Sequence, residues 1–232
     1  MELSERQQTI LKTILTEHIK TAAPVGSGVL VEKYRMDLSP ASIRNEMVEL
    51  ENQGYLAQPH TSAGRVPTVR AYRYYLEHFL KERSVAKKDQ DALKRAYASS
   101  EDDERRLKAI AKVVAHLCSN TVIVGFARRD VYYTGLANLF HQPEFEERMT
   151  ILNLSEIVDR LDEVISRIFD ATPDEPHVLL GRENPFGEET GVLLTKCHPQ
   201  SSDHLFGILG PVRMPYDHHI ALLRCMKNLF EA

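Results

Sequence analysis

The sequence predicts a protein of the α+β class with two domains. Its first third contains helix-like segments and one short Gly-containing hairpin, whereas its second half alternates amphipathic helices with short β-branched or apolar runs. A chain of 232 residues allows one large domain or two modest ones, and a charge-rich stretch separates the two patterns. We therefore expect a helical domain with a hairpin over residues 1–83, a solvated helical linker over 84–103 and an α+β domain over 104–232.

The first domain opens with a scaffold helix and a short second helix. Ser4 is a good N-cap for a helix that runs to about Thr21, with one continuous apolar stripe. Residues 22–26 interrupt the pattern and Ser27 opens the second helix, where backbone N–H groups could hold a phosphate. The alternative is an ordinary helix start without a ligand, and the residues alone leave both readings open.

The third helix has the clearest signals. Ser39 is its N-cap and Pro40 stands at the first helical position, where a missing N–H costs no hydrogen bond. Ile43, Met47 and Leu50 recur with the spacing of one buried stripe. The first turns therefore direct small and hydrogen-bonding side chains outward: Ser39, Ala41, Ser42, Arg44 and Asn45.

A tight hairpin follows the third helix at once. Gly54 closes the helix as a left-handed cap, and residues 55–58 and 66–68 form two short extended segments. A helix-turn-helix followed by such a hairpin is the pattern of a winged helix. The turn between the segments offers hydroxyls, a ring nitrogen and a cation to phosphate or to the minor groove: His60, Thr61, Ser62 and Arg65.

These residue types in this order favour double-stranded DNA as the partner. A helix entering the major groove needs small residues near its N-terminus, Arg44 suits guanine and Asn45 suits adenine. Taken alone, an amphipathic helix with one Arg and one Asn outward is most often a solvated face, but the helix, cap and basic hairpin together reverse that preference. A winged helix used only for protein contact is the alternative.

The remaining elements follow from periodicity and turn residues. Residues 68–82 return to helical spacing with an aromatic face, which is more typical of a core than of a stacking platform: Tyr72, Tyr75, Leu76, Phe79 and Leu80. In the second domain we expect helices at 104–118, capped by Ser100, and at 136–140, 154–169 and 215–230, with another starting at Pro143. Strands are expected at 120–127, 131–135, 177–180, 190–196 and 205–209.

Long and uncommon motifs stand in both halves of the chain. They are PVGSGVL at 24–30, LSPASIRNEMVELENQGYLAQPHTSAGRVPT at 38–68 with the AYRYYL that follows, GLANLFHQPEF at 135–145, LLGRENP at 179–185 and GILGPVRMPYDHHIALL at 207–223. In these motifs the chain resembles the HrcA-type heat-inducible transcription repressors of bacteria.

The resemblance implies a function and a second-domain fold. It implies a repressor that binds an inverted-repeat operator upstream of chaperone genes as a dimer and needs a GroEL-type chaperonin to stay active. It also implies a GAF-like regulatory domain, here in reduced form. Family members usually carry a long segment before GLANLF that includes a subdomain associated with dimerisation, and only residues 127–130 stand there in this chain. A winged-helix regulator of other genes that responds to a small ligand is the alternative.

Charge and composition limit how the chain can bind DNA and where it can act. The net charge of −4 divides into +1 for residues 1–83 and −5 for 84–232, so DNA binding must come from local charge placement. No membrane-length apolar run and no signal peptide is visible, which predicts a cytoplasmic, nucleoid-associated protein. Because an inverted repeat demands two-fold symmetry, we expect a homodimer held largely by residues 84–232.

The sequence carries no recognisable catalytic or metal-binding motif. The candidate metal ligands lack ligand spacing: Cys197, His198, His204, His218 and His219. Neither 181–184 nor 207–210 has the strand and helix context of a nucleotide loop, and no nucleophile elbow is present. We expect no cofactor, no metal and no enzyme activity, with an enzyme on a GAF-like frame as the rival class.

Overall fold

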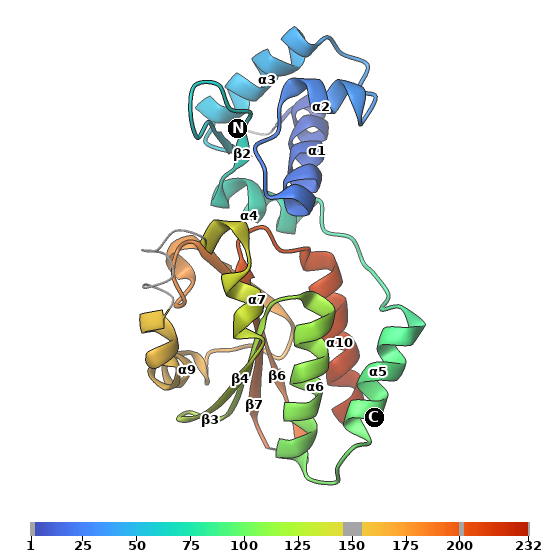
Figure 1. Cartoon of the computed structure of the whole chain (residues 1–232), viewed down its shortest axis with the longest axis vertical. Coiled ribbons are helices and arrows are strands. Elements are labelled where there is room, and N and C mark those ends of the chain that lie inside the picture. Colours follow the sequence, from blue (N-terminus) through green and yellow to red (C-terminus); the bar gives the residue numbers. More distant parts are fainter. Residues whose placement is uncertain (1–2, 146–154, 200–201, 232) are drawn as a thin grey trace. The chain divides into compact units, whose positions relative to one another are not determined.

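The computed structural model describes residues 3–145, 155–199 and 202–231, and its chain divides into two compact units, Met1–Leu80 and Lys81–Ala232. The two together mix helices with antiparallel sheet, as an α+β protein does. The elements of the first unit are α1 (Glu5–Thr21), α2 (Ser27–Glu32), α3 (Pro40–Asn52), β1 (Leu56–Ala57), β2 (Val66–Pro67) and α4 (Val69–His78) (Figure 1).

The first unit begins as its local signals predict. Ser4 caps α1 by accepting a hydrogen bond from the Gln7 backbone, and the Gln7 side chain accepts one in return from the Ser4 backbone. The buried stripe of α1 contains Ile10, Leu11, Ile14 and Leu15, all fully buried. Tyr72 of α4 completes this core, because its ring is 1% exposed and its hydroxyl lies 2.7 Å from Nδ1 of His18. Tyr72, Tyr75 and Phe79 of the predicted aromatic face are therefore core residues, whereas Leu80 is 38% exposed and α4 ends at His78.

The second unit is built on a five-stranded antiparallel sheet in the order β4-β3-β7-β6-β5. Its strands are β3 (Thr121–Ala127), β4 (Asp130–Thr134), β5 (His177–Leu180), β6 (Thr190–Cys197) and β7 (His204–Pro211). Its helices are α5 (Lys87–Tyr97), α6 (Asp103–Cys118), α7 (Leu136–Phe140), η1 (Pro143–Phe145), α9 (Leu161–Ile168), η2 (Gly181–Glu183) and α10 (Tyr216–Glu231). The register pairs Ile123 of β3 with Gly207 of β7, and Ile208 of β7 with Leu193 of β6.

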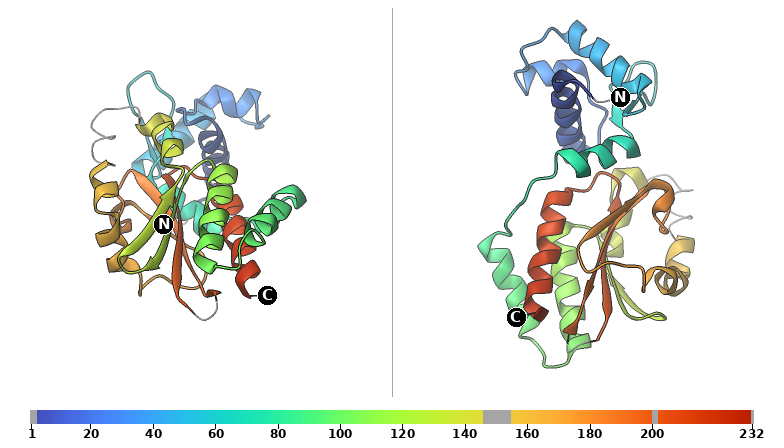
Figure 2. Two further views of the ribbon diagram at one scale, coloured as in Figure 1. Left: turned by 60° about the horizontal axis from the view of Figure 1, so that its bottom comes forward. Right: turned by 180° about the vertical axis from the view of Figure 1, so that it is seen from behind.

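Both faces of the sheet are buried. Figure 1 shows α6 and α10 along one face and α9 against the other, and Figure 2 shows the same covering from behind. On the α9 side one core cluster joins Ile123, Leu205 and Leu209 of the strands to Leu139, Phe145, Ile165 and Phe186. Val122, Val124 and Ile208 are equally buried and alternate with that set, so they face α6 and α10.

Three details of the second unit differ from the sequence-based expectation. Asp102, rather than Ser100, caps α6, because its Oδ1 accepts from the Arg105 backbone at 2.8 Å. The helix expected over 154–169 is interrupted at Arg160, whose φ of −115° and ψ of 25° are not helical; position 154 lies outside the described residues. Within the stretch predicted as a solvated linker, α5 packs against α6 and buries Leu93 completely.

Candidate nucleic-acid interface

Helix α3 supplies the centre of the candidate site. The Ser39 hydroxyl accepts from the backbone N–H of Ser42 at 3.1 Å and lies 2.9 Å from the Ser42 hydroxyl, so the cap predicted from sequence is formed. Ile43 and Leu50 are fully buried and Met47 is 3% exposed, which fixes the rotation of the helix. The opposite side of α3 is therefore held toward solvent.

The exposed side of α3 carries a continuous stripe of four residues. Ala41, Arg44, Asn45 and Val48 follow one another at the spacing of a single helical face, and all four are exposed. Among the described residues, no carboxylate pairs with the Arg44 guanidinium, so its charge is uncompensated. Sequence reasoning did not assign a role to Val48. Its place in the stripe and its exposure of 38% make it a candidate contact residue.

The β1–β2 hairpin lies beside α3 (Figure 1) and has a self-supported turn. Leu56 pairs with Pro67, and Ala57 pairs with Val66. The Gln58 side chain donates to the carbonyl oxygens of Thr61 at 3.0 Å and of Ala63 at 3.1 Å, which closes the turn from inside. His60, Thr61 and Ser62 are exposed at its tip.

The base of the hairpin is attached to the start of α2. Val25 and Arg65 exchange two backbone hydrogen bonds, of 2.8 and 2.9 Å. Gly64 passes so close to this segment that a Cβ there would lie 2.5 Å from the carbonyl carbon and oxygen of Val25. This attachment brings the N-terminus of α2, with Gly26 as its cap residue, next to the turn.

The Arg65 side chain is itself engaged. Its Nε donates to Oε2 of Glu51 at 2.9 Å, and only 13% of the side chain is exposed. Glu51 lies near the C-terminal end of α3, so this ion pair connects the hairpin to that end of the helix. Arg65 is thus placed to position the turn as well as to supply charge.

The helix, the turn and the start of α2 surround one hollow of about 380 Å³. The hollow is lined by five of the residues predicted from sequence: Ser27, Arg44, Thr61, Ser62 and Arg65. The others, Ser39, Ala41, Ser42, Asn45 and His60, do not line it. Sequence reasoning missed the roles of Gln58 and Gly64, because both depend on contacts between segments that only the folded hairpin creates.

An ion pair between a buried carboxylate and a half-exposed lysine holds α2 against α1. Glu17 is buried, accepts from Nζ of Lys33 at 2.7 Å and from the Tyr34 hydroxyl at 2.8 Å. The Lys33 bond keeps the pKa of the Glu17 carboxyl below its usual value. Burial, aided by the bond to Glu17, raises the pKa of Tyr34 to about 12. The C-terminal end of α2 is therefore held against α1.

The candidate metal ligands lie in different environments. His198 bonds to Asp203 through Nδ1 and to Asp174 through Nε2, while burial lowers the pKa of His219 to about 3. No three His, Cys, Asp or Glu side chains within the described parts of the chain are arranged to hold a metal ion. No helix in those parts has both the length and the apolar character of a bilayer span.

Comparison with known proteins identifies relatives of this chain. The family model for the HrcA protein C terminal domain matches residues 42–220. The heat-inducible transcription repressor HrcA of Pelotomaculum thermopropionicum is 39% identical over 125 residues, or 53% of this chain and 36% of the relative. Its counterpart in Thermobifida fusca is 32% identical over 171 residues, or 72% of this chain and 49% of the relative. In Natranaerobius thermophilus the identity is 56% over 80 residues, or 34% of this chain and 23% of the relative.

The matched region thus spans half or less of each of these relatives' own length. A solved structure described only as a hypothetical protein has a TM-score of 0.81 at 20% identity and covers 99% of this chain and 98% of its own, which shows a shared fold. Because the family model covers most of the sequence, the conclusion is direct: the chain belongs to the HrcA family.

Proposed function

We propose that Met1–Leu80 is a winged helix-turn-helix module that binds double-stranded DNA, and that the chain is a transcriptional repressor of heat-shock genes. The observation that carries this proposal is the exposed stripe of Ala41, Arg44, Asn45 and Val48 beside a fixed, hydroxyl-bearing turn. The relatives' names as heat-inducible transcription repressors support the choice of genes. Its site of action would be the nucleoid, in the cytoplasm.

Each part of the interface has a task in this proposal. Helix α3 enters the major groove, where Arg44 pairs with guanine, Asn45 with adenine, and Val48 contacts a thymine methyl group. Thr61, Ser62 and the N–H groups at Gly26 and Ser27 hold phosphates on either side. Ser39 and Ser42 act mainly through the start of α3, because they bond to each other there. His60 at the exposed tip of the turn is a further phosphate contact.

The second unit has a regulatory and dimerising role in the same proposal. Its five-stranded sheet with helices on both faces is the frame we assign as a reduced GAF-like domain. A homodimer would present two α3 helices to an inverted repeat. Response to a GroEL-type chaperonin is the family-based expectation for this unit, and no catalytic activity is proposed for it.

Asn45→Ala tests the proposal against Asn52→Ala as a matched control. Both asparagines are exposed on α3, but only Asn45 belongs to the stripe near its N-terminus. Loss of one bidentate base contact should cost about 1–3 kcal/mol on a preferred duplex and little on a scrambled one. Asn52→Ala should retain wild-type affinity. Fluorescence anisotropy at several salt concentrations measures both, and wild-type binding by Asn45→Ala would refute α3 as the reading helix.

A further inference from the structure

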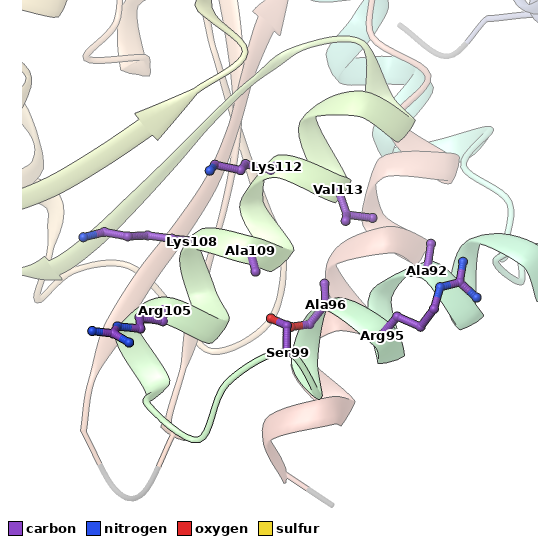
Figure 3. A pocket seen from close by; sticks show the side chains of 9 residues that line it. All are labelled: Ala92, Arg95, Ala96, Ser99, Arg105, Lys108, Ala109, Lys112 and Val113. Carbon is purple, nitrogen blue, oxygen red and sulfur yellow. The ribbon is translucent and has the colours of Figure 1, made fainter.

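A second basic feature lies in the other unit, apart from the residues assigned to DNA. A groove of about 590 Å³ runs between α5 and α6, which we call the basic groove. Small apolar side chains form its floor and cations form its rims: Ala92, Ala96, Ala109 and Val113, then Arg95, Arg105, Lys108 and Lys112, with Ser99 at one end. Figure 3 shows Arg95 on one side and Arg105, Lys108 and Lys112 on the other, with Ala96 and Ala109 between them.

The packing of the two helices creates this groove. Leu93 of α5 is buried against α6, and the Arg106 guanidinium lies 4.7 Å from the centre of the Tyr97 ring. The alanines of the floor, Ala92, Ala96 and Ala109, are too small to fill the space between the helices. On α6, positions 105, 108 and 112 share one face, and Figure 3 shows their side chains directed away from α5, so their cations form a row along the outer rim of the groove. Nζ of Lys108 also lies 5.2 Å from the centre of the Phe126 ring.

The charges of the basic groove are largely uncompensated. Within the described residues, Glu104 pairs with Lys108, whereas no carboxylate pairs with Arg95, Arg105 or Lys112. All three of these side chains are exposed. Residues 84–232, which make up nearly all of this unit, carry a net charge of −5, so this local excess of cations runs against the balance of its surroundings in the sequence. Such a patch attracts an anionic partner.

We propose that the basic groove binds an acidic amphipathic helix of a partner protein. Its apolar floor suits the apolar stripe of a helix, and its two cationic rims suit carboxylates on both sides of that stripe. A second copy packed face to face on the same groove would oppose like charges, which disfavours that occupant. A nucleic-acid backbone would leave the four alkyl side chains of the floor without an apolar partner.

A designed peptide probes this chemistry on the full chain. The probe is an 18-residue labelled helix with a leucine stripe flanked by glutamates, and its control is the same composition in scrambled order. Fluorescence anisotropy should show tighter binding of the amphipathic peptide than of the scrambled one. Equal affinity for both peptides would overturn the proposal, because the groove would then attract charge without recognising a helix.

Matched variants localise the peptide. Lys112→Glu should weaken binding about five- to tenfold, since it places a carboxylate on the rim. Lys88→Glu makes the same change at an exposed position of α5 outside the groove and should stay within about twofold of wild type. Equal losses for the two variants would reduce the attraction to net charge and overturn the proposal.

A change in the floor separates a peptide from a nucleic acid. Ala109→Phe fills the groove without altering any charge and should abolish peptide binding; Ala92→Phe fills it from α5 if the first variant does not fold, as judged by circular dichroism. Double- and single-stranded oligonucleotides should bind both Lys112→Glu and Ala109→Phe as well as they bind wild type. If oligonucleotide binding falls in both variants, the groove is a nucleic-acid site and the peptide proposal is wrong.

Discussion

The ion pair between Arg65 and Glu51 determines what a substitution in the hairpin turn should do. If the pair positions the turn, Arg65→Ala and Glu51→Ala remove the same bond of 2.9 Å. Each variant should then weaken DNA binding by about two- to fivefold, and the double variant should lose little more than either. Titration of all four proteins against one duplex measures this coupling. A loss confined to Arg65→Ala, with Glu51→Ala equal to or tighter than wild type, would mean that the guanidinium contacts phosphate directly.

The hydrogen bonds of His198 should make the stability of the protein depend on pH. Hydrogen bonds to Asp174 and Asp203 raise the pKa of His198, and the same hydrogen bonds lower the pKa of both carboxyls. The histidine contribution to stability is complete below the unfolded pKa of about 6.5 and is lost as the pH rises through the raised folded value. The carboxyl contribution is complete above about pH 4 and is lost on acidification.

His198→Gln tests this pH dependence. The wild-type advantage in thermal midpoint over His198→Gln should be larger at pH 5.5 than at pH 8.5, and small at both because the groups are partly exposed. Thermal denaturation followed by circular dichroism at the two pH values gives the comparison. An advantage that does not change with pH would show that His198 contributes by packing and not by charge.

Among the elements, the β1–β2 hairpin is positioned by the close approach of Gly64 to the backbone of Val25. A Cβ at Gly64 would lie 2.5 Å from Val25 backbone atoms and 2.8 Å from the Gly26 nitrogen, and backbone cannot move aside as a side-chain end can. Gly64→Ala should therefore displace the hairpin from α2, cost about 1–3 kcal/mol of stability and weaken DNA binding. Gly28→Ala is the control, since an added Cβ there meets only the far end of the Glu32 side chain, at 4.0 Å. Thermal denaturation and DNA titration compare the two variants. A Gly64→Ala protein as stable and as tight on DNA as Gly28→Ala would show that hairpin attachment is unimportant.

Elements whose signals are local could be predicted from the sequence. Ser39, Pro40 and the stripe through Leu50 define α3, because a cap, a first-turn proline and a 3.6-residue period need no knowledge of the rest of the fold. The cap of α6 was missed since Ser100 and Asp102 are both good caps, two residues apart. Burial of Leu93 was missed because it depends on where α6 lies. The same limit applies to the Gly64 contact with Val25.

At the scale of the whole molecule, strands β3 and β4 of the second unit are joined directly, without a long segment between them. Residues 128–129 form a two-residue turn between the strands, and the register shifts between Gly125 and Ala127. Resemblance to longer repressors predicted that a dimerisation subdomain is absent at this point. A dimer formed without that subdomain would use other surfaces, which makes its symmetry on DNA the property to measure.

Selection of duplexes from a random pool by the full chain measures that symmetry directly. A two-fold homodimer holding one α3 per half-site should select two copies of one short motif in inverted orientation, with centres about 10–10.5 base pairs or a multiple apart. Binding both half-sites at once should make the full repeat at least about a hundredfold tighter than a single half-site. A variant carrying Asn45→Ala should lose the motif preference in both halves equally. Selection of a single, unrepeated motif, together with a monomeric mass by sedimentation equilibrium on the bound duplex, would refute the dimer while leaving DNA binding by α3 intact.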